Sequence, residues 1–204
     1  MDDEKWMRIY EVLNSNLKGV EDVLDEAIET LKEKSFNRRI AFDLLLKVAE
    51  EKPEILLRYT DKLKKLIGGG FESVYVSMVL GRLSLRYPRV VDEETVSKIF
   101  DLLNRDEMKC YILLALSDIA ISNPKLLSNH IQDLINLIKD RSWEVRWNTA
   151  RVFVNLIESD LSLVKSCIDR IEGIAKNERF KPSVRVVAQV ILNEFKKFNR
   201  EQPS

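Results

Sequence analysis

The sequence holds few of the residues that build metal centres and nucleophilic active sites. Its 204 residues include two cysteines and one histidine. Cys110 and Cys167 lie 57 residues apart, without the spacing of a zinc site or a redox pair, and His130 stands in no catalytic motif. We therefore expect no metal, no cofactor and no catalytic residue. The expectation is a reduced, cytoplasmic protein without enzyme activity.

The sequence also lacks a long hydrophobic run and an excess of either charge. The longest apolar run, Tyr111–Leu116, is far too short to cross a bilayer, and the acidic N-terminus has no signal-peptide core. Lysine plus arginine number 33, as do aspartate plus glutamate, so bulk charge favours no polyanionic partner. Residues 1–30 nevertheless carry nine acids and three bases, whereas residues 176–200 carry seven bases and two acids. We expect no membrane association, while a charged patch at either end stays open as a binding feature.

Helical periodicity is the strongest positive signal. Asp140–Ile157 predicts a turn and then an amphipathic helix, because Val145, Thr149, Phe153 and Leu156 fall on one helical face. Related segments recur at spacings of 35, 36, 37 and 39 residues, with reference positions at Asn37, Glu72, Met108, Val145 and Val184. A second marker agrees, since a proline precedes an apolar pair at Pro53, Pro88 and Pro124. Paired helices that repeat every 35 to 40 residues are typical of an α-solenoid.

Two segments carry a resemblance to a known family. The residues Asp-Arg-Ser-Trp-Glu-Val-Arg-Trp-Asn-Thr-Ala at 140–150 resemble the HEAT-repeat family, and so does Val184–Ala188. The resemblance covers roughly residues 20–197 and is weakest in the second unit, where Glu72-Ser73 replaces Val-Arg and leaves the register open by about one residue. It implies an all-α fold, a right-handed solenoid of about five HEAT- or armadillo-like helix pairs. The expected parts are a capping helix at 1–19, a repeat array at 20–198 with units near 20–52, 53–87, 88–123, 124–160 and 161–198, and a frayed tail at 199–204.

The first helix is expected to cover the open end of the array. The spacing places an apolar face on residues 5–17, and Asn16 and Gly19 predict its end. The members of that face are Trp6, Ile9, Tyr10, Leu13 and Leu17.

A base follows most of the reference positions, and two interpretations of these bases are open. The four basic residues are Arg38, Lys109, Arg146 and Arg185. They could form a ladder for an anion, or they could bond to carboxylates and backbone carbonyls of the adjacent repeat. The HEAT resemblance implies the second, structural role.

The most informative positions lie two and six residues after each reference position. In HEAT-like repeats the second helix lines the concave surface, and these positions are usually polar. From the second unit onward they are mostly apolar here: Val74, Met78, Cys110, Leu114, Trp147, Arg151, Val186 and Val190. They predict either an exposed partner-binding strip or a tighter superhelix that buries these side chains between helices. Trp143, expected in a turn, is either an interface anchor or folded back over its own repeat.

These observations favour a scaffold or adaptor that binds a protein helix or an extended peptide on its concave face. The alternative is a nucleic-acid-binding protein or enzyme similar to the HEAT-like alkylpurine DNA glycosylases, which hold DNA in a basic groove. Trp147 and Arg151 share a face, and the C-terminal end is basic, which fits that alternative; the zero net charge and the apolar groove positions oppose it. A similarity to HEAT-repeat bilin lyases has no specific residue in its support.

Overall fold

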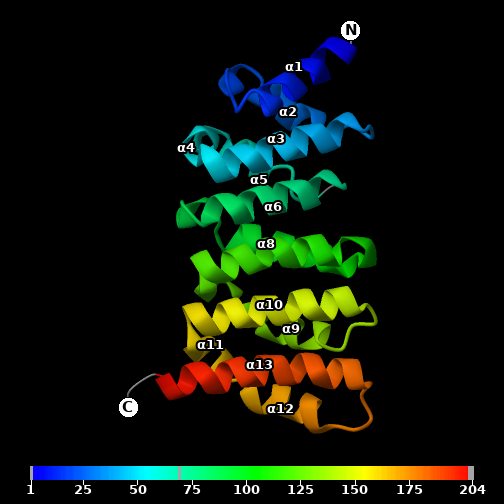
Figure 1. Cartoon of the computed structure of the whole chain (residues 1–204), viewed down its shortest axis with the longest axis vertical. Helices are drawn as coiled ribbons and strands as arrows, with labels where there is room; N and C mark the ends of the chain where they lie inside the picture. The colour runs from blue at the N-terminus through cyan, green and yellow to red at the C-terminus, as the bar shows by residue number, and fades with distance from the viewer. Residues whose placement is uncertain (1, 69, 202–204) are drawn as a thin grey trace. The chain divides into compact units, whose positions relative to one another are not determined.

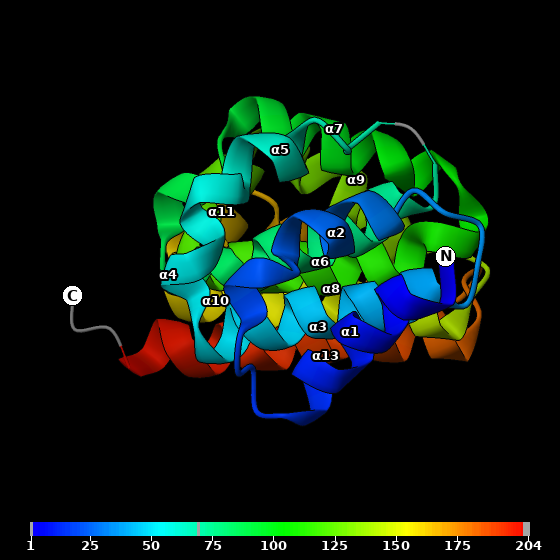
Figure 2. The ribbon, with the colours of Figure 1, turned by 90° about the horizontal axis from the view of Figure 1, so that it is seen from above.

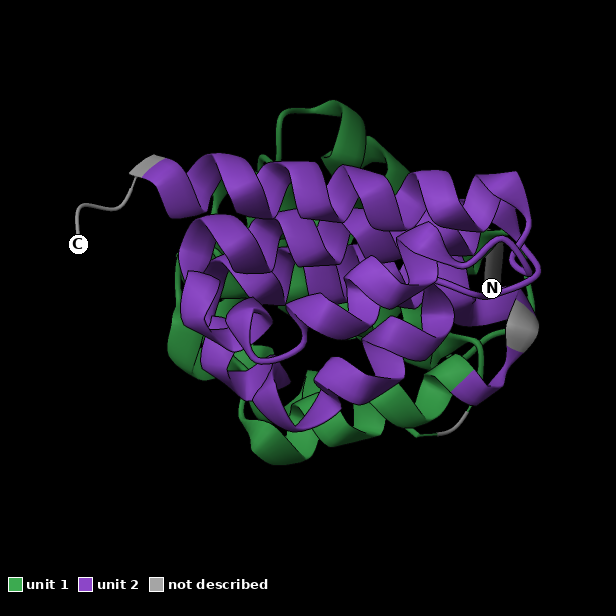
Figure 3. Cartoon of the chain, turned by 90° about the horizontal axis from the view of Figure 1, so that it is seen from below, with its two compact units in different colours: residues 1–103 green, residues 104–204 purple. Residues whose placement is uncertain are grey.

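The computed structural model describes residues 2–68 and 70–201. All regular elements in these residues are helical and none is a β-strand, which confirms the all-α expectation. None of these helices combines the length and the apolar character that a membrane crossing requires. The chain divides into two compact units, residues 1–103 and 104–204 (Figure 3).

Unit 1 is built on one central helix with neighbours on both sides. Its helices are α1 (Asp2–Asn14), α2 (Leu24–Thr30), α3 (Asn37–Glu51), α4 (Pro53–Leu56), α5 (Thr60–Lys64), α6 (Glu72–Ser84) and α7 (Glu93–Asp101). Helix α3 packs against α1 on one side and α6 on the other (Figure 1). Helices α2 and α5 lie on the same side of α3 and α6 (Figure 2). Fully buried aliphatic side chains such as Ile28, Leu45, Leu63 and Leu80 fill the space between these two layers.

Helix α1 ends at Asn14, before Asn16 and Gly19 but three residues short of the predicted segment 5–17. Asn16, Leu17 and Gly19 have φ values of 58°, 59° and 71°, the left-handed conformation that stops a helix. Two lysines of α3 then satisfy carbonyls near this end: Lys47 Nζ donates to the Leu13 carbonyl at 3.0 Å and Lys52 Nζ to the Leu17 carbonyl at 3.2 Å. The end of α1 is thereby fixed to α3.

The expected apolar face of α1 was wrong at two positions, because Leu17 lies beyond the end of the helix and Tyr10 is exposed. Ile9 and Leu17 are buried and Leu13 is half-buried, but Tyr10 is 49% exposed. Ile9 and Leu13 lie on the buried side of α1, and the residue after Ile9 points about 100° away around a helix.

Unit 2 is also built on a central helix. Its helices are α8 (Lys109–Ser122), α9 (Ile131–Leu137), α10 (Trp143–Ser159), α11 (Leu161–Lys165), α12 (Ile168–Lys176) and α13 (Pro182–Glu201). Helix α10 lies between α8 and α13, and α12 packs on α13 (Figure 1). Helix α13 continues beyond the predicted array boundary at residue 198, and residues 202–204 of the expected tail lie outside the described residues.

The predicted starts of the second helices agree closely with the structure. Helices α3 and α6 begin at Asn37 and Glu72, as expected. The other three begin at Lys109, Trp143 and Pro182, within two residues of the reference positions. Local chemistry explains two of these starts, because Ser142 caps α10 by accepting a hydrogen bond from the Val145 amide and proline suits the first turn of a helix.

The first helix of each pair differs from the expected single helix. Pro53, Pro88 and Pro124 do begin a new element, as predicted. Short 3-10 segments then interrupt the α-helical ladder, at Leu57–Tyr59 between α4 and α5 and at Pro124–His130 before α9. The chain therefore reaches each second helix through two or more helical segments.

Candidate binding surface

Lys109 serves the structure of unit 2. Its Nζ lies 2.8 Å from Asp140 Oδ2, and both side chains are largely withdrawn from solvent, with 15% and 9% exposed. The other oxygen, Asp140 Oδ1, accepts a hydrogen bond from the Ser142 amide at 2.9 Å. This arrangement ties the start of α8 to the turn before α10.

Arg146 makes a second link of this kind. Its side chain is buried, and Nη1 donates to the carbonyls of Asp140 and Arg141 at 2.7 and 3.1 Å. Nη2 donates to Ser183 Oγ at 3.0 Å, just after α13 begins. The contacts of Arg146 support the structural role that the resemblance implied rather than an anion ladder.

The register of the proposed strip was wrong in unit 1. Val74 is fully buried, so it offers no surface to a partner. The inner face of α6 begins at Ser73 and not at Glu72. Ser73 is buried, and its hydroxyl donates to the Leu66 carbonyl at 3.0 Å. The next residue, Tyr75, is half-buried, and so is Met78.

The outward side of α3 and α6 is occupied by contacts within unit 1. Arg39 Nε lies 3.0 Å from Asp43 Oδ1, and Arg82 Nη1 lies 3.6 Å from Glu50 Oε1. Aromatic rings add further contacts. Phe42 stacks on Tyr75 with 4.5 Å between centroids, and the Arg38 guanidinium lies 5.1 Å from the Phe71 ring centroid. The charged and aromatic side chains on this side of unit 1 therefore have partners within the unit.

Unit 2 presents the corresponding positions differently. Trp147 is 42% exposed and Val186 52% exposed, while Arg151 is also exposed. Cys110, Leu114 and Val190 are half-buried. Helical spacing explains the exposure, since Val145, Thr149, Phe153 and Leu156 form the buried face of α10 and leave Trp147 and Arg151 on the opposite side.

Trp143 is the first residue of α10 and not part of a turn, which corrects its predicted position. It is 59% exposed and lies one helical turn before Trp147, so the two indoles share a side of the helix. The Trp143 side chain is therefore not folded back over its own repeat.

The sequence interpretation missed one member of this surface. Tyr111, on α8, is 44% exposed beside Cys110 and Leu114. The signal was present, because Tyr111 and Leu114 are spaced for one helical face, but the run Tyr111–Leu116 was interpreted only with respect to membrane crossing. We name the complete set the Trp147 face: Cys110, Tyr111, Leu114, Trp143, Trp147, Arg151, Val186 and Val190.

Cys110 belongs to this face as an apolar group rather than as a nucleophile. Burial and the nearby Glu144 carboxylate raise the pKa of the Cys110 thiol, although a hydrogen bond with Asn148 opposes them. The thiol is therefore protonated at neutral pH, and the thiolate is the reactive form.

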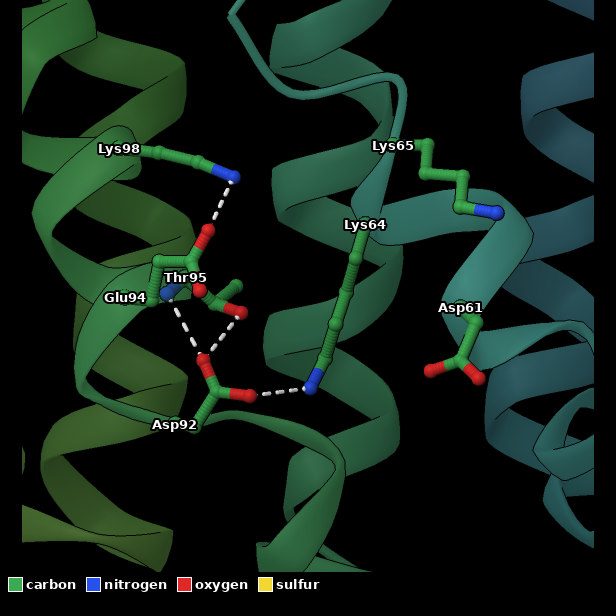
Figure 4. Close-up of a pocket in the computed structure, with 7 residues that line it drawn as sticks. All are labelled: Asp61, Lys64, Lys65, Asp92, Glu94, Thr95 and Lys98. Atoms are coloured by element: carbon green, nitrogen blue, oxygen red, sulfur yellow. Dashed lines mark hydrogen bonds and ion pairs between the residues drawn. The ribbon is translucent and has the colours of Figure 1, made fainter.

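A pocket of about 250 Å³ in unit 1 lies between α5 and α7 (Figure 4). Its lining residues are Asp61, Lys64, Lys65, Asp92, Glu94, Thr95 and Lys98. Two of the lysines reach acids inside the pocket: Lys64 Nζ lies 2.5 Å from Asp92 Oδ2, and Lys98 Nζ lies 2.7 Å from Glu94 Oε1. Acids pair with two of the three lining lysines, so the pocket has the character of an ion-pair cluster rather than of an anion site.

Asp92 in this pocket caps α7 and should stabilise the fold in a pH-dependent way. Burial opposes its ionisation, but Lys64 and two hydrogen bonds from Thr95, at 2.8 and 2.7 Å, lower the pKa of Asp92 to about 2. Asp92→Ala should therefore cost about 0.5–2 kcal/mol at neutral pH. An aspartate in the unfolded chain has a pKa near 3.9, so this contribution is complete above about pH 4 and is lost as the pH falls through about 2.

Urea unfolding of the wild type and of Asp92→Ala at several pH values measures this difference. Glu93→Ala is the matched control, because Glu93 is an exposed acid in the same first turn. A difference that is absent at pH 7, or that stays constant down to pH 2, would contradict the capping role.

Comparison with known proteins adds information about the fold alone. No protein-family model matches the chain, and no curated protein sequence matches it. The chain is similar to the crystal structure of an engineered protein, with a TM-score of 0.61 and 17% sequence identity, over 94% of this chain and 88% of the other. At this identity the similarity concerns the helical architecture and not an activity.

Proposed function

We propose that the chain is a right-handed α-solenoid of the HEAT type that acts as a non-catalytic, cytoplasmic scaffold for another protein. The helix pairs, the second helices that begin close to the predicted positions and the prolines that begin the first segments support the repeat architecture. Repeat proteins of this kind offer extended surfaces rather than deep clefts. An interaction role suits such a surface.

The Trp147 face is the observation that carries this proposal. It combines two exposed tryptophans with aliphatic side chains, and Trp147 lies on the central helix of unit 2. Tryptophan is enriched among the residues that dominate binding energies, and such residues cluster near the centre of an interface. Exposed apolar groups on three packed helices would lose contact with water if a partner covered them, which favours association.

The proposed ligand is an amphipathic helix or an extended peptide laid across α8, α10 and α13. A helix offers apolar side chains at positions i, i+3, i+4 and i+7, which can pack against a flat aromatic and aliphatic surface. Nucleic acid is the alternative, and exposed Trp147 beside Arg151 is the feature in its favour. Arg151 is the single base among the eight residues of the face, whereas affinity for nucleic acid grows with the number of phosphates neutralised.

Trp147→Ala should weaken binding of a peptide ligand at least tenfold without unfolding the protein. Truncation of a hot-spot aromatic residue typically costs about 2 kcal/mol or more of binding free energy. The peptide ligand can be selected from a random display library on the wild-type protein, so the test needs no natural partner. Calorimetric titration of the selected peptide with both proteins gives the affinity ratio.

Phe36→Ala is the matched control, because Phe36 is an aromatic residue of unit 1 with 78% exposure. It should leave the peptide affinity unchanged. Equal affinities of the wild type and Trp147→Ala would sink the proposal, whereas tight and strongly salt-dependent binding of duplex DNA would favour the nucleic-acid alternative.

A further inference from the structure

Arg151 is the charged residue among the eight of the Trp147 face, and it is the last of the three members on α10. It is exposed on α10, and no hydrogen bond or ion pair joins it to another residue in the part of the chain that the structure describes. The positions within one turn of it on α10 are Trp147, Asn148, Val154 and Asn155, none of which is an acid. Unit 1 offers a contrast, because Arg39 on α3 is paired with Asp43 one turn later.

A partner that covers the Trp147 face must also cover this arginine. Removing a guanidinium from water without a counter-charge is costly, so a partner without an acid at this point would bind poorly. A carboxylate matches the guanidinium best, since it can accept two parallel N–H hydrogen bonds. The structure thus favours a partner with an acid at one defined point.

The same side of α10 limits how acidic the partner can be. Glu144 and Glu158 are exposed seven residues before and seven residues after Arg151. At a rise of about 1.5 Å per residue, each lies roughly 10 Å along the helix from Arg151. Hydrogen bonding from Ser142 lowers the pKa of Glu144, which keeps this acid ionised. A run of phosphates or of acids laid along α10 would meet these two negative charges.

We propose that the partner of the Trp147 face is a protein segment that carries apolar side chains and a single carboxylate. Its apolar groups pack on Trp147, and its carboxylate pairs with Arg151. The charge pattern along α10, negative then positive then negative, selects this segment over an acid-rich helix and over a nucleic-acid strand. This inference rests on the proposed binding function and adds the chemistry of the ligand.

Selection of peptides on the wild-type protein, followed by exchange of charges, tests the inference. The selected peptides should contain a glutamate or aspartate together with apolar residues. Changing this acid to glutamine should weaken binding to the wild type about three- to tenfold and should have no effect on Arg151→Gln. Arg151→Glu should reverse the preference and bind a lysine version of the peptide better than the acidic one. Arg179→Gln, an exposed arginine outside the face, is the control and should behave as the wild type.

The outcomes separate the two proposals. Peptides that need Trp147 but lack an acid, or that bind Arg151→Gln as tightly as the wild type, overturn the inference and leave the binding function standing. Peptides that bind equally well to Trp147→Ala overturn the binding function as well, as does a selection that enriches no peptide. Self-association of the wild type that Trp147→Ala abolishes would assign the face to a second copy of the chain and would also overturn the inference.

Discussion

Replacing Phe153 by alanine is expected to cost about 3–5 kcal/mol of unfolding free energy, a large share of the stability of an ordinary domain. Phe153 is fully buried, and it lies on the central helix of unit 2, with α8 on one side and α13 on the other. Its removal would leave a cavity that α10 cannot fill by moving toward one neighbour without separating from the other. Both the lost burial of the ring and the residual cavity therefore contribute to the cost.

Urea unfolding monitored by circular dichroism measures this loss, with Phe36→Ala as the control. The ring of Phe36 is 78% exposed, so its truncation should change the stability by less than about 0.5 kcal/mol. If Phe153→Ala unfolds at the same urea concentration as the wild type, the assignment of the buried face of α10 is wrong.

Arg146→Met should also destabilise the fold strongly, by about 2–4 kcal/mol. The methionine keeps much of the apolar volume but removes the donors that serve the carbonyls of Asp140 and Arg141 and the hydroxyl of Ser183. Hydrogen bonds from a charged donor contribute about 1.5–3 kcal/mol, and buried acceptors left without a partner add to the loss. The turn before α10 should therefore loosen.

Hydrogen exchange at the amides of residues 139–146, together with urea unfolding, tests this role. Arg179→Met is the control, because Arg179 is exposed and its side chain lies outside this network. A variant with wild-type stability and unchanged exchange would mean that Arg146 is not a structural link, and an anion-binding role for the basic positions would regain support.

Much of the helical architecture was predictable from the sequence because it depends on local chemistry. Proline suits the first turn of a helix, so the starts at Pro53, Pro88 and Pro124 were placed correctly. Asn16 and Gly19 marked the region where α1 ends, although the helix stops at Asn14. The 3.6-residue period likewise identified the buried face of α10.

The errors arose where packing between helices decides the outcome. Val74 and Tyr75 are neighbours in a helix without a strong repeat motif, and a shift of one residue exchanges a buried position for a half-buried one. Tyr10 is exposed because of the direction in which α1 meets α3. The period also does not encode the 3-10 breaks at Leu57–Tyr59 and Pro124–His130.

In the candidate site, too, the sequence predicted the positions of residues along each helix but not the packing between helices. Trp147, Arg151 and Val186 were selected from their position in the repeat, but the period alone left open whether they are exposed or buried between helices. That choice depends on how closely α8, α10 and α13 approach one another, which only the structure gives. Tyr111 was missed because the repeat pattern marked Cys110 and Leu114 and not the residue between them.

Fluorescence of Trp147 in the presence of a selected peptide tests most directly whether the Trp147 face is the binding surface. The chain has three tryptophans, so the double variant Trp6→Phe, Trp143→Phe leaves Trp147 as the single indole. Binding should shift its emission to shorter wavelength and reduce its quenching by acrylamide, because a bound segment removes the exposed indole from water. An unchanged spectrum and unchanged quenching, under conditions where calorimetry shows the peptide bound to this variant, would contradict the account.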